Sequence, residues 1–99
     1  MPDIDREIIL AVARELGNSG DVVIRQLGVP DHIISVVEAR HPKNMINFHL
    51  ECLMRWCEMK TIDANPDNLK KALADNDRRD LVQLVNDHLS GKTAGYITN

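Results

Sequence analysis

The chain has 99 residues, of which 43% are hydrophobic and 27% charged, and its formal net charge is −3. These values predict one globular domain and argue against a largely disordered chain. The weakly acidic balance argues against nucleic-acid binding, because nonspecific affinity for phosphate backbones depends on lysine and arginine. There is no run of 18 apolar residues and no signal-peptide layout at the N-terminus, so we expect no membrane insertion and a cytoplasmic location.

Three helices are predicted in the first 40 residues. Apolar side chains recur every four positions from Ile4 to Leu16, which predicts a helix over residues 3–16 that Asp3 or Asp5 caps and Gly17 ends. A short helix over 22–27 follows, with Asp21 as its cap and Gly28 at its end. Pro30 suits the first turn of a third helix, which we expect to stop at Arg40, before the dipeptide at 41–42.

The stretch 44–60 is the most hydrophobic part of the chain. On a helical projection its apolar residues cover roughly two thirds of the circumference, more than a surface helix needs. We therefore expect this helix to be the hub of the fold, with Trp56 and Leu53 in the core. Two alternatives remain for the margins of its apolar arc. The first is that one margin, either the side with Ile46, Leu50 and Met54 or the side with Phe48, is exposed to a partner. The second is that both margins are buried.

Two more helices are predicted after a polar loop over 61–64. Asn65 and Pro66 form a cap followed by a first-turn proline, which predicts a fifth helix over 66–74. Asp77 is predicted to cap a sixth helix over 78–89, with Leu81 and Leu89 on its buried face. We expect a domain over 1–90 and a flexible tail over 91–99. The sum is an all-α, antiparallel helical bundle with Val37 and Leu81 among its core residues.

No catalytic, cofactor or metal site is predicted, and we expect no enzyme. Cys52 and Cys57 point about 140° apart on one helix, so they cannot form a disulfide within it, and we expect two reduced thiols. His49 lies three residues before Cys52 and is the best available base for a cysteine nucleophile, but a packed histidine is favoured. The four histidines have no spacing typical of metal ligands.

A helix-turn-helix module that binds nucleic acid is an alternative of a different class. The second and third helices are joined by a short turn that such a DNA-binding module could use. The second of these helices begins with Asp31 and has no Arg, Asn or Gln placed to reach a base edge. We therefore favour the interpretation that these two helices only pack within the fold and do not bind DNA.

Charges elsewhere fall into two groups, which favours a function in protein binding. Arg25, Arg40 and Lys43 belong to the second to fourth helices, whereas Asp63, Asp67, Asp75 and Asp77 belong to the fifth and sixth. Surfaces of opposite charge on one small domain favour head-to-tail assembly.

Three stretches of the chain, in this order and spacing, resemble a death domain. They are LGVPDHIISVVEARHP at 27–42, LMRWCE at 53–58 and ANPDNLKKALADNDRRDLVQLV at 64–85, and the resemblance covers residues 5–89. Trp56 falls where the family has its core tryptophan, and DRRDLV at 77–82 is similar to the segment that enters the sixth helix of the family. The chain departs from the family at Val22, where many members have tryptophan, and at His49, where an aliphatic residue is usual.

The resemblance implies a six-helix antiparallel Greek-key bundle without catalytic activity. It implies an adaptor that assembles apoptotic or innate immune signalling complexes by binding other death-domain proteins, as a homo- or hetero-oligomer, and a receptor- or kinase-side death domain is the close alternative. Partner binding by adaptor members uses the second and third helices. Carried over to this chain, with the neighbouring Lys43 added, the expected contact residues are Arg25, Val29, Asp31, Arg40 and Lys43.

Overall fold

The computed structural model describes the backbone of residues 5–98 and the side chains of residues 5–90. In the described backbone the chain forms six α-helices and two short 3-10 helices and has no β-strand, which confirms the predicted all-α class. The elements are α1 (Arg6–Glu15), η1 (Gly17–Ser19), α2 (Gly20–Gln26), α3 (Asp31–Arg40), α4 (Met45–Lys60), η2 (Thr61–Asp63), α5 (Pro66–Asp75) and α6 (Arg79–Thr98).

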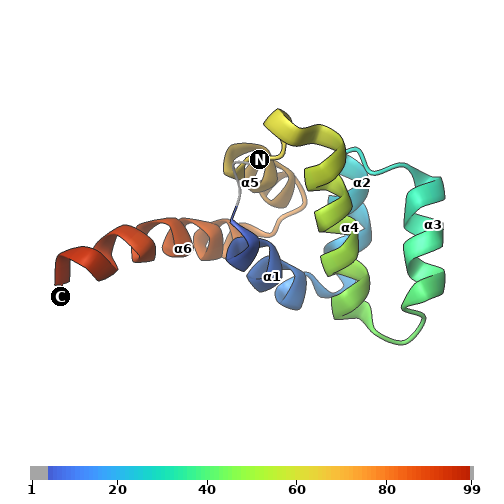
Figure 1. The fold of residues 1–99 in the computed structure, drawn as a ribbon, viewed down its shortest axis with the longest axis horizontal. Coiled ribbons are helices and arrows are strands. Elements are labelled where there is room, and N and C mark those ends of the chain that lie inside the picture. The colour runs from blue at the N-terminus through green and yellow to red at the C-terminus, as the bar shows by residue number, and fades with distance from the viewer. Residues whose placement is uncertain (1–4, 99) are drawn as a thin grey trace.

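Helix α4 is the hub of the bundle. It packs against α1, α2 and α3, while α6 packs against α1 and α5, and α5 also reaches α2 (Figure 1). Trp56, Leu53, Val37 and Leu81, which the sequence predicts as core residues, are each no more than 2% exposed. The hydrophobic residues of α4 therefore join the inward faces of its neighbours in one continuous core.

Helices α2 and α5 end in the same backbone motif. At the end of α2, Gly28 has a φ of 99°, its N–H donates to the Arg25 carbonyl at 3.1 Å, and the Val29 N–H donates to the Ile24 carbonyl at 3.4 Å. This pairing is the Schellman motif, which satisfies carbonyls that the last helical turn leaves open. The sequence-based prediction that Gly28 ends this helix is correct.

Asp77 has a different role from the one predicted. Its φ is 60°, its N–H donates to the Ala74 carbonyl at 3.1 Å, and the Arg78 N–H donates to the Leu73 carbonyl at 2.8 Å. Asp77 thus occupies the left-handed position of a second Schellman motif and closes α5, so the prediction that it caps the sixth helix is wrong. Aspartate is one of the few residues besides glycine that adopts this conformation readily.

Helices α1 and α2 also begin differently from the predictions. Asp5 is extended and its side chain accepts from the Glu7 N–H at 3.1 Å, which confirms Asp5, one of the two predicted residues, as the cap. Helix α1 begins at Arg6, three residues later than expected. Helix α2 begins at Gly20, two residues before its predicted start, and no side chain caps it. Asp21 lies in its first turn and pairs with Arg25, so its predicted role as the cap is wrong.

Helix α6 continues through Thr98, although the sequence predicts its end at Leu89. Residues 79–98 contain no proline, so the backbone hydrogen-bond ladder has no obligatory stop. Figure 1 shows the second half of this helix projecting away from the bundle. Leu89, predicted to be buried, is 38% exposed because it lies beyond the part of α6 that the other helices cover.

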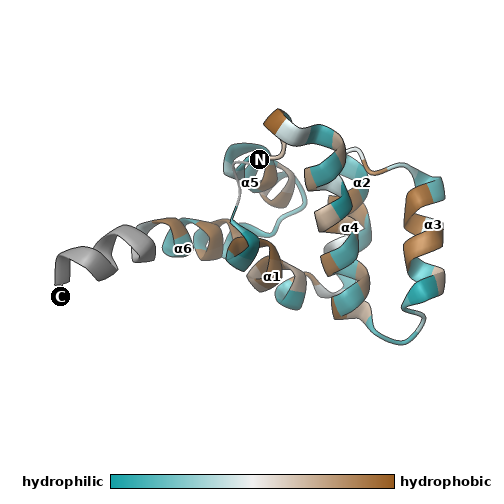
Figure 2. Cartoon of the chain, viewed as in Figure 1, coloured by the Kyte–Doolittle hydropathy of each residue, from teal (hydrophilic) through white to brown (hydrophobic). Residues whose placement is uncertain are grey.

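Hydrophobic and hydrophilic residues alternate around the helices of the bundle (Figure 2). Among the helices formed by residues 5–98, none has the length and the hydropathy to cross a membrane.

Candidate functional site

Two of the predicted contact residues, Arg25 and Asp31, belong to one exposed ion cluster. The Arg25 Nε donates to Asp21 Oδ2 at 3.0 Å, and the guanidinium of Arg25 also pairs with Asp31 across the turn between the helices. Hydrogen bonding and attraction to Asp21, together with attraction to Asp31, raise the pKa of Arg25 above its ordinary value. Exposed ion pairs contribute little to stability, so this cluster adds little to holding the fold together.

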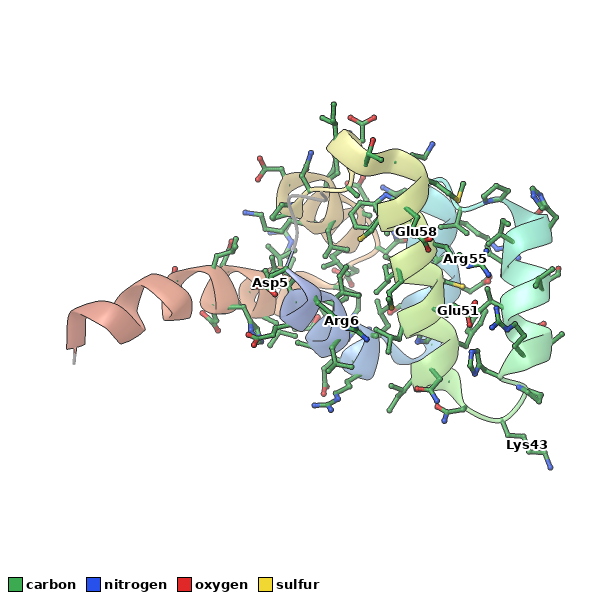
Figure 3. All side chains as sticks on the ribbon, viewed as in Figure 1. Asp5, Arg6, Lys43, Glu51, Arg55 and Glu58 are labelled. Carbon is green, nitrogen blue, oxygen red and sulfur yellow. The ribbon has the colours of Figure 1, made fainter. Side chains whose placement is uncertain are left out.

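Arg25 and Lys43 line one cleft, although 18 positions separate them in the sequence. The cleft, of about 570 Å³, lies between the start of α2 and the turn that joins α3 to α4. Asp21, Glu38 and His41 also line it. Figure 3 shows the Lys43 side chain extending from the turn away from the bundle. The structure therefore brings together two of the cations that the sequence proposed.

Arg40 lies in a separate network that centres on Glu51. Its Nη1 donates to Glu51 Oε2 at 2.7 Å, while His41 Nε2 lies 2.8 Å from Oε1 and Arg55 Nη2 donates to Oε2 at 3.2 Å. The bond from His41, and then the two guanidinium groups, lower the pKa of Glu51. Figure 3 shows Glu51 and Arg55 on the same side of α4, toward α3.

Glu51 is not among the residues predicted to be functional from the sequence. The spacing of four residues between Glu51 and Arg55 is a recognisable helical ion-pair signal. The contacts from the end of α3 have no such local signal, because they depend on how α3 and α4 pack.

Val29 does not belong to the exposed surface. It is 4% exposed and packs in the core, since the Schellman motif after α2 turns it inward. A partner would therefore contact little of the Val29 side chain, and its role as a contact residue stays a prediction. The remaining four predicted residues, Arg25, Asp31, Arg40 and Lys43, are exposed.

The structure distinguishes the two margins of the apolar arc of α4. Ile46 is 44% exposed and Met54 36% exposed, and Leu50 between them is partly buried, whereas Phe48 is only 9% exposed. Leu50 and Met54 also line a shallow groove of about 570 Å³ together with Arg40, Glu51 and Arg55. The margin with Ile46, Leu50 and Met54 is therefore the one that reaches the surface.

The two groups with potential reactivity are enclosed. Cys52 has no exposed surface, and burial, more than the nearby carboxylates, raises the pKa of its thiol to about 11. Its thiolate is therefore scarce at neutral pH, and the thiolate is the nucleophilic form. His49 is 3% exposed, and its Nδ1 has no hydrogen-bond partner in the described structure. Burial lowers the pKa of His49, which outweighs the opposite effects of the Ala13 backbone and Asp21.

Gly20 is the reason that His49 fits between α2 and α4. A Cβ atom on Gly20 would lie 2.1 Å from Nε2 of the imidazole ring, closer than any real contact. Glycine at this position lets the helix backbone approach the ring directly.

Among residues 5–98, no group of three or more His, Cys, Asp or Glu side chains is arranged to hold a metal ion. No model of a known protein family matches the chain, and a search of curated proteins finds no match.

Proposed function

We propose that this chain is a non-enzymatic adaptor of the death-domain class, with its six helices in the antiparallel Greek-key arrangement. It assembles apoptotic or innate immune signalling complexes in the cytoplasm by binding other death domains. The resemblance of residues 5–89 to that class supports the proposal, as does a bundle of six helices whose hub carries Trp56.

The observation that carries the proposal is the exposed cleft that Arg25 and Lys43 share. Its charged groups come from α2, from the end of α3 and from the turn between α3 and α4. Cys52 has no exposed surface, and His49, which also lines the cleft, is 3% exposed. A surface of oriented charges favours selective and rapid association with a partner of complementary charge. The primary contact surface that we propose consists of Arg25, Asp31 and Lys43, with Arg40 at its edge.

A complementary surface is present on the same chain. Asp63, Asp67 and Asp77 are exposed around α5, and none of them has an ion pair shorter than 3.7 Å with a described residue. A domain that carries Arg25 and Lys43 in one cleft and exposed aspartates elsewhere can bind its neighbour head to tail. Such a contact leaves one surface open at each end, so further domains can be added.

Arg25→Glu tests the proposal. The chain and the variant are presented, as full-length protein, to the purified death domains of the source organism. We expect at least one of them to bind the original chain and the variant to lose that binding. Circular-dichroism melting should change little, because the side chain is exposed and its ion pairs are at the surface.

Arg79→Glu is the matched control, because Arg79 is also exposed but lies at the start of α6. It should retain binding. Equal binding by all three proteins would reject the assigned surface, and binding of duplex DNA with a strong salt dependence would favour the helix-turn-helix alternative instead.

A further inference from the structure

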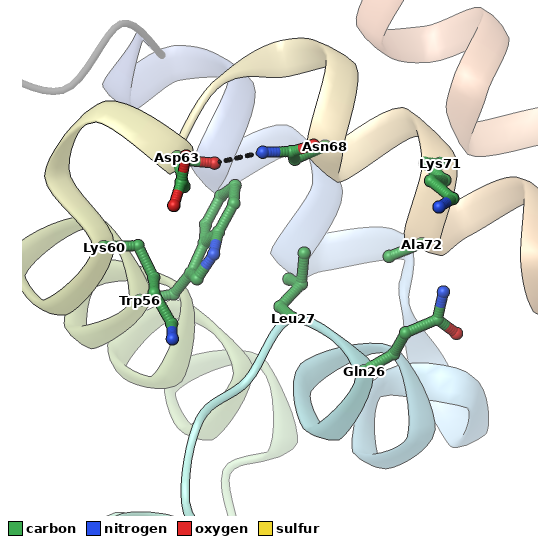
Figure 4. Close-up of a pocket in the computed structure, with 8 residues that line it drawn as sticks. All are labelled: Gln26, Leu27, Trp56, Lys60, Asp63, Asn68, Lys71 and Ala72. Carbon is green, nitrogen blue, oxygen red and sulfur yellow. Dashed lines mark hydrogen bonds between the residues drawn. The ribbon is translucent and has the colours of Figure 1, made fainter.

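A second hollow, distinct from the cleft of Arg25 and Lys43, lies between the end of α2, the end of α4, η2 and α5 (Figure 4). Its volume is about 370 Å³. Eight residues line it: Gln26, Leu27, Trp56, Lys60, Asp63, Asn68, Lys71 and Ala72.

The floor of this hollow includes a hydrogen-bond donor that the protein does not use. No described residue accepts a hydrogen bond from the indole Nε1 of Trp56. Among the described residues, Nδ1 of His49 is the one side-chain polar atom that is both fully enclosed and without a partner. The unpartnered indole N–H is therefore not fully enclosed, and Trp56 lines the hollow. Buried tryptophan usually finds an acceptor for this group, and here the acceptor position is open.

Two lysines flank the floor from different helices. Figure 4 shows Lys60 and Lys71 on opposite sides of Trp56 and Leu27. Lys60 packs over the end of α2, because a Cβ atom on Gly28 would lie 3.1 Å from its Cε and 3.3 Å from its Nζ. Neither ammonium group forms an ion pair within 4 Å among the described residues, so both charges are available.

The polar side chains at the rim are already fixed by other bonds. Gln26 donates from Nε2 to Asp75 at 2.7 Å and accepts from Asn76 at 2.8 Å, while Asn68 donates to the Asp63 carbonyl at 2.7 Å. These bonds hold the rim in place without occupying the lysines or the indole. Asp63 is the one carboxylate in the lining, so the two ammonium groups outweigh it.

We propose that this hollow binds a phosphate monoester carried by a small molecule or a lipid headgroup. The indole N–H donates to one phosphate oxygen, and Lys60 and Lys71 balance the charge from the two sides. A phosphate monoester carries close to two negative charges at neutral pH and several acceptor oxygens, which matches two cations and a neutral donor better than one carboxylate does. This site does not depend on the proposed adaptor function.

The single tryptophan of the chain provides a direct probe. The ¹⁵N-labelled full chain is titrated with inorganic phosphate and then with glucose 6-phosphate, and the Trp56 indole N–H resonance is followed. We expect a saturable downfield shift with both ligands. A vesicle arm compares phosphatidylcholine alone with phosphatidylcholine that contains phosphatidylinositol 4-phosphate. Stronger binding to the phosphorylated vesicles than to glucose 6-phosphate assigns a lipid source, and the reverse order assigns a soluble one.

The double variant Lys60→Gln/Lys71→Gln should weaken phosphate binding by at least about tenfold, because each charge-assisted contact is worth roughly that much. Lys43→Gln is the matched control, since it removes one exposed ammonium group from the other cleft, and should leave the titration unchanged. No indole shift with any ligand, or equal weakening by Lys43→Gln, overturns the proposal. Because the double variant leaves Arg25 intact, it should retain death-domain binding, so the two proposals can fail separately.

Discussion

Helix α4 has two faces that both carry hydrophobic side chains but differ in what covers them. On one face, Cys52, Leu53 and Trp56 are at most 2% exposed and are enclosed by neighbouring helices. On the other, Ile46 and Met54 are 44% and 36% exposed. The helix therefore carries more apolar surface than the other five helices cover. Burial on one face holds the bundle together, and the excess on the other is available to a partner.

The two faces also differ in how they treat polar groups. The enclosed face holds one polar side chain, His49, whose Nδ1 has no partner. The open face holds Glu51, which accepts bonds from three side chains. Polar groups on the open face can exchange partners with water or another protein, whereas a change on the enclosed face must disturb the packing. Substitutions on the enclosed face should thus lower stability more than substitutions on the open face.

Trp56→Ala should have the largest effect. The side chain is 2% exposed and is part of the continuous core, so its removal leaves a large cavity. The free energy of unfolding should fall by about 3–5 kcal/mol. Urea denaturation followed by circular dichroism at 222 nm measures this loss. A change below about 1 kcal/mol would show that α4 is not the hub.

Gly20→Ala should have a smaller effect than Trp56→Ala. Alanine normally stabilises a helix relative to glycine, by at most about 1 kcal/mol. Here the added Cβ meets the enclosed His49 ring, so we expect destabilisation instead, of about 1–3 kcal/mol. The same denaturation measurement gives the sign.

The matched control for Gly20→Ala is the same change in a His49→Ala background, where the ring is absent. There the alanine should be neutral or stabilising, and the difference between the two backgrounds measures the coupling between the two sites. Equal loss in both backgrounds would mean that the contact with His49 is not the cause.

Features that depend on the local sequence can be predicted, whereas a packing contact such as that of Gly20 with His49 cannot. The spacing of apolar residues along α4 predicts its burial because the helical period is a local property. Gly28 is predictable for the same reason, since a left-handed residue after a helix is a local requirement. Asp77 is ambiguous in the sequence: aspartate can cap the next helix or adopt the left-handed conformation that closes the previous one, and only the path of the backbone decides.

The candidate contact surface was harder to predict than the core. Arg25 and Asp31 are near one another in the sequence, but the cleft that Arg25 shares with Lys43 depends on how the α3–α4 turn packs beside α2. The burial of Val29 was not predicted for a related reason. The sequence around a hydrophobic residue in a turn does not show whether its side chain faces the core or the solvent. The hollow at Trp56 has no sequence signature, because four elements build it.

Acidification should affect the enclosed face through His49. Burial lowers its pKa in the folded state below the ordinary value of 6.5. Above pH 6.5 the ring is neutral in both states and its titration does not alter stability. Below pH 6.5 the unfolded chain binds the proton first, so stability falls as the pH drops toward the folded-state pKa. We expect stability to be lower at pH 5.5 than at pH 7, measured as a lower urea midpoint.

His49→Leu is the control for this pH dependence. It should remove most of the slope in that window, because leucine has no proton to gain. Glu51 does not confuse the result: its pKa is lowered from 4.5, so the stability that it contributes is lost only at more acidic pH. An unchanged slope in His49→Leu would assign the effect to another group.

Met54→Ala should have the smallest effect on stability, and Leu53→Ala gives the matched comparison one residue away. Leu53 has no exposed surface, and its truncation should lower the free energy of unfolding by about 2–5 kcal/mol. Met54 is 36% exposed, and its truncation should change that free energy by no more than about 0.5 kcal/mol. Parallel urea titrations of the two variants measure the difference. Similar losses in both would mean that the two faces of α4 are equally enclosed in solution, for example by self-association, in which case the loss for Met54→Ala should grow with protein concentration.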